Sequence, residues 1–407
     1  MIKRSHIIAC SFITLALLLS ACGTAATEAP TSAPAATQAM PAATEAPQAT
    51  AAPTELPAGS VQVTAGGATF PFPLYQQWTY AFQAVDPSTV INYQGIGSGG
   101  GKSNIINGTF DFAGSDSVLN DQNYTDGKDL QMYPMVASAV VPVYNIKWKL
   151  PAAAAGQPTP AAPTASLVLD RQTLVDIYNG KVKTWNDPEI VNLNPDLKDN
   201  LPSDPIVTVH RSDGSGTTEI FTNSLTSFSP DWKAGAGQSV EWPIKDSLGG
   251  KGNPGVAGLV INTPDSLGYV ELAYAVSNKI PYAKLVNKAG KTVTANGDSI
   301  KSAMADYATA FDKHLNAKIV DGPGDGSWPI TGYTYLILHT QNMQDCVKAQ
   351  KILEYINWTL TSPLAAQAAT NLGYAVLPDA VKQQVIAKLG EVTCNGQPVP
   401  IMAPSGQ

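Results

Sequence analysis

A strand is predicted to turn into a helix within Val209-His210-Arg211-Ser212-Asp213-Gly214-Ser215-Gly216-Thr217-Thr218, a segment from the middle of the 407-residue chain. The free N–H groups and the positive dipole end at the start of a helix favour anions, and a guanidinium binds two oxygens of a tetrahedral oxyanion at once. The same residues also suit a polar turn, with Ser215 or Thr217 as the helix cap and Arg211 paired with Asp213 at the surface. Both interpretations stay open on this segment alone.

Strand-like and helix-like stretches alternate on both sides of this segment. Such alternation predicts an α/β architecture with mainly parallel sheets. The predicted strands span residues 61–65, 90–94, 111–113, 132–144, 206–210, 256–261 and 334–339. The predicted helices span residues 74–84, 171–178 after the cap Asp170, 343–361, and 380–389 after Asp379.

The N-terminus has the pattern of an export signal. Lys3 and Arg4 precede an apolar run over residues 7–19, which is short for a membrane-spanning helix. The run ends in Leu19-Ser20-Ala21-Cys22, which resembles a bacterial lipobox. We expect residues 1–21 to be a lipoprotein signal peptide and Cys22 to carry the lipid that anchors the protein to the outer face of the cell membrane. The alternative is a plain signal peptide with an incidental cysteine.

Two tracts have compositions that cannot form a core. Residues 22–60 are almost all Ala, Thr, Pro, Ser and Gln, which predicts a disordered tether. Residues 151–166 are similar and interrupt globular sequence, so we expect an exposed loop insertion there. The rest of the chain is apolar enough for two ordinary domains, since 44% of all residues are hydrophobic.

Charge and cysteine content narrow the class of protein further. The formal net charge is −7, and no basic face is visible, which argues against a nucleic-acid partner. Of the four cysteines, Cys10 would leave with the signal and Cys22 would carry lipid. Cys346 and Cys394 remain, and outside the cytoplasm they could form a disulfide or stay as two buried thiols.

Three other segments resemble the first in placing small or polar residues where a predicted strand ends. They are Gly66-Gly67-Ala68-Thr69-Phe70-Pro71, Gly95-Ile96-Gly97-Ser98-Gly99-Gly100-Gly101-Lys102 and Asp111-Phe112-Ala113-Gly114-Ser115-Asp116. Thr69 offers a hydroxyl and Phe70 a backbone N–H, and the glycines leave backbone N–H groups accessible to anionic oxygens. The first segment is equally consistent with a connector in which Thr69 only caps a helix.

Asp116 is the unexpected residue in an anion site. Its carboxylate can accept the hydrogen of a protonated oxyanion such as hydrogen phosphate, whereas fully ionised sulfate would bring two acceptors together. Asp116 therefore predicts selectivity for phosphate over sulfate. The alternative is an aspartate in a turn or helix cap.

The second segment also fits parts of two nucleotide-binding motifs. Gly95, Gly97 and Gly100 match G-x-G-x-x-G, but dinucleotide cofactors are cytoplasmic and suit an exported chain poorly. Residues 101–103 look like the end of a P-loop, but Ile96 stands where that motif needs its first glycine. Ser215 lacks the G-x-S-x-G spacing of a nucleophile, and the histidines are scattered. We therefore predict no catalytic residue, no metal site and no cofactor.

Taken together, these segments resemble the PstS family, the substrate-binding proteins of phosphate ABC transporters. The matching residues are Gly67-Ala68-Thr69-Phe70-Pro71, Asn92-Tyr93-Gln94-Gly95-Ile96-Gly97-Ser98, Asp111-Phe112, Ser115-Asp116, and Arg211 with Asp213-Gly214-Ser215-Gly216-Thr217. Further matches are Gly249-Gly250-Lys251-Gly252-Asn253, Gly268-Tyr269-Val270-Glu271 and Trp328-Pro329-Ile330-Thr331-Gly332-Tyr333. The resemblance extends from about Val61 to Leu389.

The resemblance implies a two-lobed periplasmic-binding-protein fold of type II that closes on one phosphate in the cleft between the lobes and delivers it to an ABC permease. One lobe would comprise residues 61–137 and 313–401, and the other residues 138–312. The implied phosphate contacts are Thr69, Phe70 through its N–H, Ser98, Asp116, Arg211, Ser215, Gly216 through its N–H, and Thr217. Asp213 would support Arg211 by a salt link, and we expect a monomer.

The sequence departs from the family at two positions near these contacts. His210 stands where many relatives have a second basic residue, and Gly99 where relatives often have a second serine. The alternatives that remain are a receptor for another tetrahedral oxyanion such as arsenate, and an extracytoplasmic phosphatase.

Overall fold

The long strand β4 (Leu130–Asn145) pairs with two different neighbours along its length. Its residues 130–139 run antiparallel to β11 (Thr331–His339), and its residues 140–145 run antiparallel to β8 (Ser266–Glu271). All of β4 except its last residue is buried. This computed structural model describes residues 59–153, 156–158 and 160–402. β4 therefore connects the two halves of one sheet through the core.

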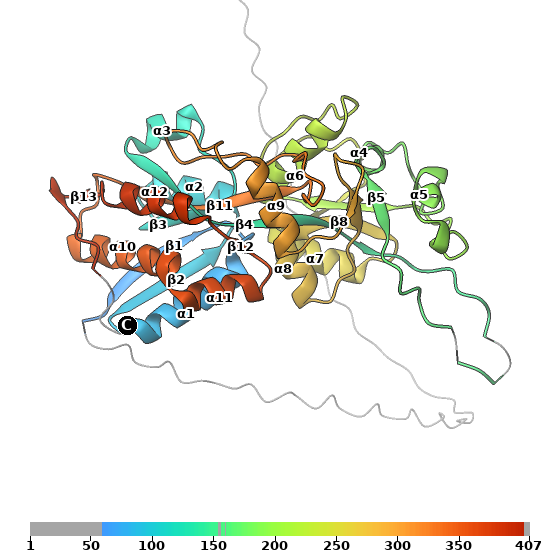
Figure 1. Ribbon diagram of the computed structural model, residues 1–407, viewed down its shortest axis with the longest axis horizontal. Coiled ribbons are helices and arrows are strands. Elements are labelled where there is room, and N and C mark those ends of the chain that lie inside the picture. The colour runs from blue at the N-terminus through green and yellow to red at the C-terminus, as the bar shows by residue number, and fades with distance from the viewer. Residues whose placement is uncertain (1–58, 154–155, 159, 403–407) are drawn as a thin grey trace, which may run out of the picture. The chain divides into compact units, whose positions relative to one another are not determined.

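That sheet contains nine strands, and Figure 1 shows β4 between β11 and β8 in the middle of the molecule. Their order is β2 (Thr89–Gly95), β1 (Val61–Gly67), β3 (Phe112–Ser115), β11, β4, β8, β6 (Val207–Arg211) and β7 (Leu248–Gly250), with β12 (Ala375–Val376) paired to β4. The pairs at both ends of the sheet are parallel, and those made by β4 and β11 are antiparallel. The prediction of mainly parallel sheets was wrong, because β4 and β11 run antiparallel to their neighbours in the middle of the sheet, and the alternation of strands and helices along the chain does not reveal which strands become neighbours.

The helices lie along both halves of this sheet. They are α1 (Phe72–Val85), α2 (Ser98–Ile106), α3 (Asp121–Gly127), α4 (Arg171–Tyr178), α5 (Pro188–Leu193), the 3₁₀ turn η1 (Pro195–Leu197), α6 (Gly216–Phe228), α7 (Gly252–Asn262), α8 (Leu272–Ser277), α9 (Gly297–Asp306), α10 (Cys346–Thr361), α11 (Pro363–Asn371) and α12 (Asp379–Leu389). Short strands complete the described chain: β5 (Val168–Asp170), β9 (Lys284–Val286), β10 (Thr292–Val293), β13 (Thr393–Cys394) and β14 (Gln397–Pro398). None of the described helices is long and apolar enough to cross a membrane.

Helix α1 shows how apolar spacing produces these packed helices. Leu74, Trp78 and Phe82 recur every four residues and are buried. Phe82 packs on Tyr355 and Trp358 of α10, with ring centroids 5.3 and 5.5 Å apart. Burying a side chain of this kind contributes about 1.5 to 3 kcal/mol. Figure 1 shows α1, α10 and α11 side by side next to β1 and β2.

The predicted strand over residues 256–261 was wrong, because this stretch belongs to helix α7. Val256, Ala257 and Val260 are buried on one helical face, while Ile261 is 46% exposed. A Cβ on Gly268 of β8 would lie 2.8 Å from Val260 Cγ2, so this glycine lets the helix pack closely on the sheet. Burial against the sheet therefore overrode the strand preference of the β-branched residues.

Two capping predictions had different outcomes. Asp170 caps α4 as predicted, since its side chain accepts a hydrogen bond from the N–H of Thr173. Asp379 does not cap α12, because the helix already begins at Asp379 and Pro378 precedes it.

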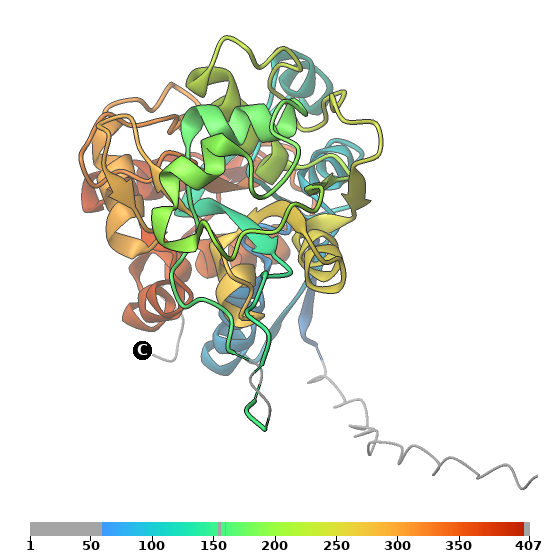
Figure 2. The same cartoon turned by 90° about the vertical axis from the view of Figure 1, so that its right-hand side faces the viewer.

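Part of the predicted domain scheme falls on described residues. Residues 151–153, 156–158 and 160–166 belong to no helix or strand and are mostly exposed. In Figures 1 and 2 this green loop between β4 and β5 extends away from the neighbouring elements. The predicted signal peptide, Cys22 and residues 22–58 of the tether lie outside the described residues.

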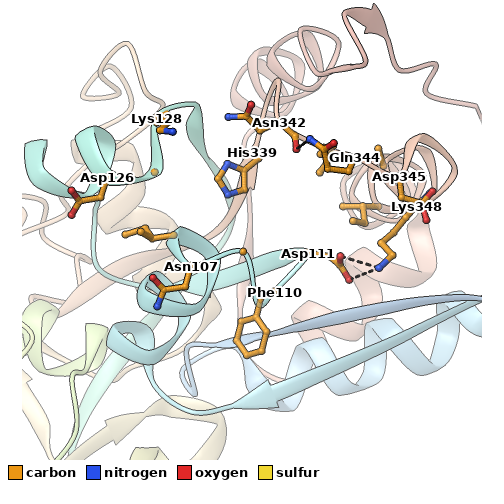
Figure 3. A pocket seen from close by; sticks show the side chains of 16 residues that line it. Asn107, Phe110, Asp111, Asp126, Lys128, His339, Asn342, Gln344, Asp345 and Lys348 are labelled. Carbon is orange, nitrogen blue, oxygen red and sulfur yellow. Dashed lines mark hydrogen bonds and ion pairs between the residues drawn. The ribbon is translucent and has the colours of Figure 1, made fainter.

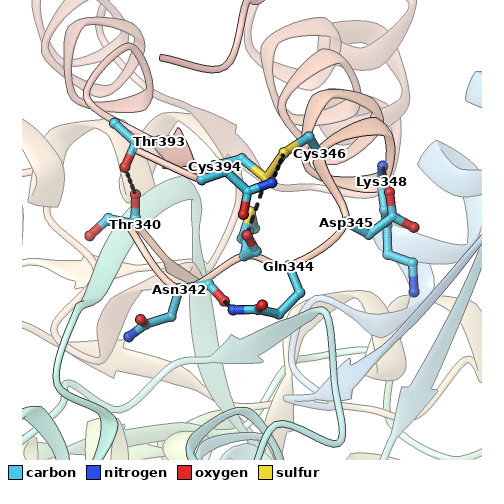
Figure 4. The surroundings of a disulfide bond; sticks show 10 residues. Thr340, Asn342, Gln344, Asp345, Cys346, Lys348, Thr393 and Cys394 are labelled. Atoms are coloured by element: carbon cyan, nitrogen blue, oxygen red, sulfur yellow. Dashed lines mark hydrogen bonds between the residues drawn. A yellow bond between two sulfur atoms is a disulfide. The ribbon is translucent and has the colours of Figure 1, made fainter. Parts of the chain in front are cut away.

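A disulfide joins Cys346, at the start of α10, to Cys394 in β13 (Figure 4). The two Cα atoms are 5.5 Å apart, and the cysteines are separated by 48 positions in the sequence. The N–H of Thr393 also donates to the carbonyl of Thr340 at 2.8 Å. The C-terminal strands β13 and β14 are therefore held against α10 covalently.

Candidate functional site

One group of predicted contacts lies at the carboxyl ends of three parallel strands. Gly67 of β1 is in register with Gly95 of β2 and with Gly114 of β3, so the three strands end together. The residues that follow these strand ends are Thr69, Phe70, Ser98 and Asp116, which we call the first wall. Ligands of open α/β sheets commonly bind at such strand ends.

The second group surrounds the junction between β6 and α6. β6 ends at Arg211 and α6 begins at Gly216. Ser215 caps the helix, because its Oγ accepts a hydrogen bond from the N–H of Thr218 at 3.0 Å. We call Arg211, Ser215, Gly216 and Thr217 the second wall. The predicted helix cap and the predicted anion site thus coincide.

The two walls are in direct contact. The N–H of Gly216 donates to Ser98 Oγ at 3.2 Å, and the N–H of Gly99 donates to the carbonyl of Gly214 at 2.9 Å. Every residue of both walls is buried. The structure therefore brings all the predicted contacts together in one place shielded from solvent.

Glycines make this close approach possible. Gly97 has a φ of 90°, and a Cβ added there would lie 2.3 Å from Asp213 Oδ2. A Cβ on Gly216 would lie 2.6 Å from Asp116 Cβ. Any side chain at either position would force the walls apart.

The guanidinium of Arg211 is oriented by Asp213. Arg211 Nε donates to Asp213 Oδ1 at 2.8 Å, and Nη2 donates to Asp213 Oδ2 at 2.6 Å. Burial raises the pKa of Asp213, but the hydrogen bonds and charge of Arg211 outweigh burial and lower that pKa below its ordinary value. Arg211 Nη1 points the other way and lies 3.3 Å from Thr217 Oγ1. Asp213 thus binds one edge of the guanidinium, and the Nη1 edge faces Thr217.

Asp116 has a hydrogen-bond donor on each oxygen. Oδ1 accepts from Thr334 Oγ1 at 2.7 Å, and Oδ2 accepts from Ser98 Oγ at 3.3 Å. Burial raises the pKa of Asp116 to about 7, although the bond from Thr334 and the charge of Arg211 act in the opposite direction. A buried carboxyl beside a guanidinium and a helix N-terminus suits an anion that carries a proton of its own.

The chain is similar in sequence to curated phosphate-binding proteins. A family model for the PBP superfamily domain matches residues 28–363. Phosphate-binding protein PstS of Pasteurella multocida is 38% identical over 329 residues, which cover 80% of this chain and 89% of that protein. The protein of the same name from Methanocaldococcus jannaschii is 34% identical over 352 residues, covering 81% and 85%.

The chain therefore belongs to the PstS family. Its fold agrees with this assignment: a high-affinity periplasmic phosphate-binding protein, solved with phosphate bound, superposes with a TM-score of 0.64 at 20% identity. The match covers 84% of this chain and 100% of that one. The predicted fold class, a two-lobed α/β periplasmic-binding-protein fold, is confirmed.

Asn253 joins the two walls, although the sequence did not single it out as a contact. Its Nδ2 donates to Thr69 Oγ1 and to Thr217 Oγ1, both at 3.0 Å, so one amide joins the two walls. Its Oδ1 accepts from the N–H of Glu271 at 2.9 Å. In the sequence, Asn253 occurred only as the last residue of one segment that resembles the PstS family, with nothing to indicate a contact. Thr334, which donates to Asp116, could not be recognised as a site residue from the sequence, because an isolated threonine in a strand is common.

Glu271 is a buried acid next to this network. Its Oε1 accepts from Ser138 Oγ at 2.7 Å, and its Oε2 has no hydrogen-bond partner among the described residues. Burial raises the pKa of Glu271 to about 8, although the hydrogen bond from Ser138 acts to lower it. Burial therefore favours the protonated form of Glu271 at neutral pH.

The structure also contains a cavity of about 500 Å³ that includes none of the predicted contacts (Figure 3). Asp111 and Lys348 form an ion pair of 3.0 Å along its lining, and His339 lies nearby. Within the described part of the chain, no group of three or more His, Cys, Asp or Glu residues is placed to hold a metal ion.

Proposed function

We propose that this protein binds inorganic phosphate outside the cytoplasm and delivers it to an ABC-type importer. The observation that carries the proposal is that the two contacting walls place the buried guanidinium of Arg211 and the buried carboxyl of Asp116 near the N-terminus of α6. The guanidinium of Arg211 and the dipole of α6 offset the negative charge of the oxyanion, and hydroxyl groups donate hydrogen bonds to it. The carboxyl group of Asp116 accepts the hydrogen that the oxyanion carries. Family membership supports the same conclusion.

We assign the phosphate contacts to both walls. Thr69, Ser98, Ser215 and Thr217 supply hydroxyl groups, Phe70 and Gly216 supply backbone N–H groups, and Arg211 and Asp116 supply the charged groups. Asp213 occupies Nε and one N–H of Nη2, which leaves the Nη1 edge of Arg211 for ligand oxygens. A fixed guanidinium loses little entropy on binding.

Release requires the walls to separate, because their residues are buried in this structure. In our proposal they lie on different lobes, formed by residues 61–137 with 313–401 and by residues 138–312. The change of partner along β4, from β11 to β8 at Val140, is a suitable place for a hinge. Closing excludes water and strengthens each hydrogen bond to the anion.

The cellular arrangement follows from the N-terminal sequence. Lipid on Cys22 would hold the protein at the outer face of the membrane, and residues 22–60 would tether it within reach of the permease. We propose that the protein acts as a monomer and that it is not an enzyme.

Calorimetry with phosphate, arsenate and sulfate tests this function. We expect one phosphate per chain, arsenate at the same site because it is also protonated, and much weaker binding of sulfate. Absence of phosphate binding would overturn the proposal. Hydrolysis of a phosphoester that disappears in Ser215→Ala would instead identify a phosphatase.

A further inference from the structure

Lys102 is a buried lysine that lines a cavity beside the contact between Gly99 and Gly214, and the proposed function gives it no role. We call this cavity the mouth, because it lies next to both walls. It lies in helix α2 and is only 8% exposed. Its Nζ donates to Ser117 Oγ at 2.7 Å and to the carbonyl of Val118 at 2.6 Å. Burial lowers the pKa of Lys102 to about 8, while the charges of Glu219 and Asp116 act to raise it. The nearby carboxylates therefore favour the charged form of Lys102.

Ser117 links Lys102 to Glu219 by two hydrogen bonds. A serine hydroxyl donates one hydrogen bond and can accept from another group at the same time. Ser117 Oγ accepts from Lys102 and donates to Glu219 Oε2 at 2.6 Å. The hydroxyl is thus the middle of a directed chain from an ammonium group to a carboxylate.

The chain of hydrogen bonds crosses from one wall to the other. Lys102 and Ser117 follow β2 and β3 on the side of the first wall, whereas Glu219 lies in the first turn of α6, next to the second wall. The Gly99–Gly214 backbone hydrogen bond joins the same two segments. If the walls separate, the bond between Ser117 and Glu219 must break.

We propose that Lys102, Ser117 and Glu219 form a latch that holds the closed cleft and sets how slowly phosphate leaves. The inference rests on the proposed function, since it concerns release of that ligand. None of the three belongs to the assigned phosphate contacts, so the latch acts on the closed form and not on the anion. Hydrogen bonds to charged groups are among the stronger ones in proteins, and here they form where the side chains are buried or half-buried.

The chain offers a matched control in Lys318. Lys102, Ser117, Glu219 and Lys318 line the same cavity of about 800 Å³ at the mouth. Lys318 is exposed, and its ammonium takes part in none of the hydrogen bonds of the latch. Lys318→Met therefore removes a positive charge from the mouth and leaves the latch intact.

The test measures the dissociation rate of radiolabelled inorganic phosphate, chased with unlabelled phosphate, from the full-length protein. We expect Glu219→Met to raise this rate by roughly 10-fold or more, the value of one hydrogen bond to a charged group. We expect Lys102→Met to act in the same direction, and the double variant to add little to either single change. Lys318→Met should leave the dissociation rate unchanged.

A second readout separates a latch from a general structural role. The latch stabilises only the closed form, so the unfolding temperature of the phosphate-free Glu219→Met protein should stay close to that of the wild type.

A dissociation rate in Glu219→Met equal to that of the wild type would overturn the latch, even if Lys102→Met fails to fold. So would a faster rate that Lys318→Met reproduces. Wild-type protein that binds no phosphate would remove the proposed function and the latch together, whereas normal binding with unchanged rates would remove the latch alone.

Discussion

Arg211 and Asp213 form a bidentate ion pair, in which Arg211 Nε lies 2.8 Å from Asp213 Oδ1 and Nη2 lies 2.6 Å from Oδ2. The side chain of Arg211 is only 1% exposed, so this cation is buried, and the carboxylate that orients it is half-buried. Asp213 Oδ1 also accepts from the N–H of Gly252 at 3.0 Å. The orientation of the guanidinium is therefore fixed by Asp213, which precedes α6, and through it by the first residue of α7.

Arg211→Ala is expected to weaken phosphate binding by roughly 2 to 5 kcal/mol, the range for removing one member of a buried charge pair. Titration calorimetry measures the change directly. Arg171→Ala is the matched control, because Arg171 forms an ion pair of 2.6 Å with Asp321 and is not among the proposed contacts. An unchanged dissociation constant in Arg211→Ala would exclude Arg211 from the site.

Asp116→Asn is expected to reduce the discrimination between phosphate and sulfate. Asparagine keeps the size of the side chain but presents an N–H₂ donor, which can pair with an oxygen of fully ionised sulfate. We expect sulfate affinity to rise relative to phosphate affinity, as measured by competition between the two anions. If the wild-type protein binds both anions equally well, Asp116 has no part in selectivity.

How far the sequence predicted this site depends on where each residue lies in the chain. Arg211, Ser215 and Asp116 occur in short segments at strand ends, where local chemistry points to an anion. Asn253 and Thr334 reach the same place from distant parts of the chain, and only the folded sheet brings them there. The wrong strand in α7 and the mixed strand directions have a related cause, because tertiary packing decides both.

Replacing Cys346 and Cys394 by serine is expected to lower the free energy of unfolding by about 4 kcal/mol, which the chain-entropy model gives for a loop of this length. Chemical denaturation of the wild type and the double variant measures the difference. The disulfide ties β13 to α10 and includes no proposed phosphate contact, so the dissociation constant for phosphate should not change. Reduction of the wild-type protein should reproduce the loss of stability, and equal stability with and without reductant would contradict it.

Glu271→Gln is expected to change how stability depends on pH. With its pKa raised to about 8 by burial, Glu271 is expected to keep its proton in the folded protein up to that pH, whereas an unfolded chain releases it at about pH 4.3. Between these values the folded state binds more protons than the unfolded state, so this group makes stability fall as pH rises, by at most about 1.4 kcal/mol per unit. Glutamine cannot release a proton, and the unfolding free energy of the variant relative to the wild type should therefore rise steadily from about pH 5 to about pH 8.

Glu241→Gln is the control for this prediction. The side chain of Glu241 is 88% exposed and its pKa lies below the ordinary value, so the difference in unfolding free energy between this variant and the wild type should not change over that range. Parallel curves for the wild type and Glu271→Gln would show that Glu271 is ionised in the folded protein at neutral pH.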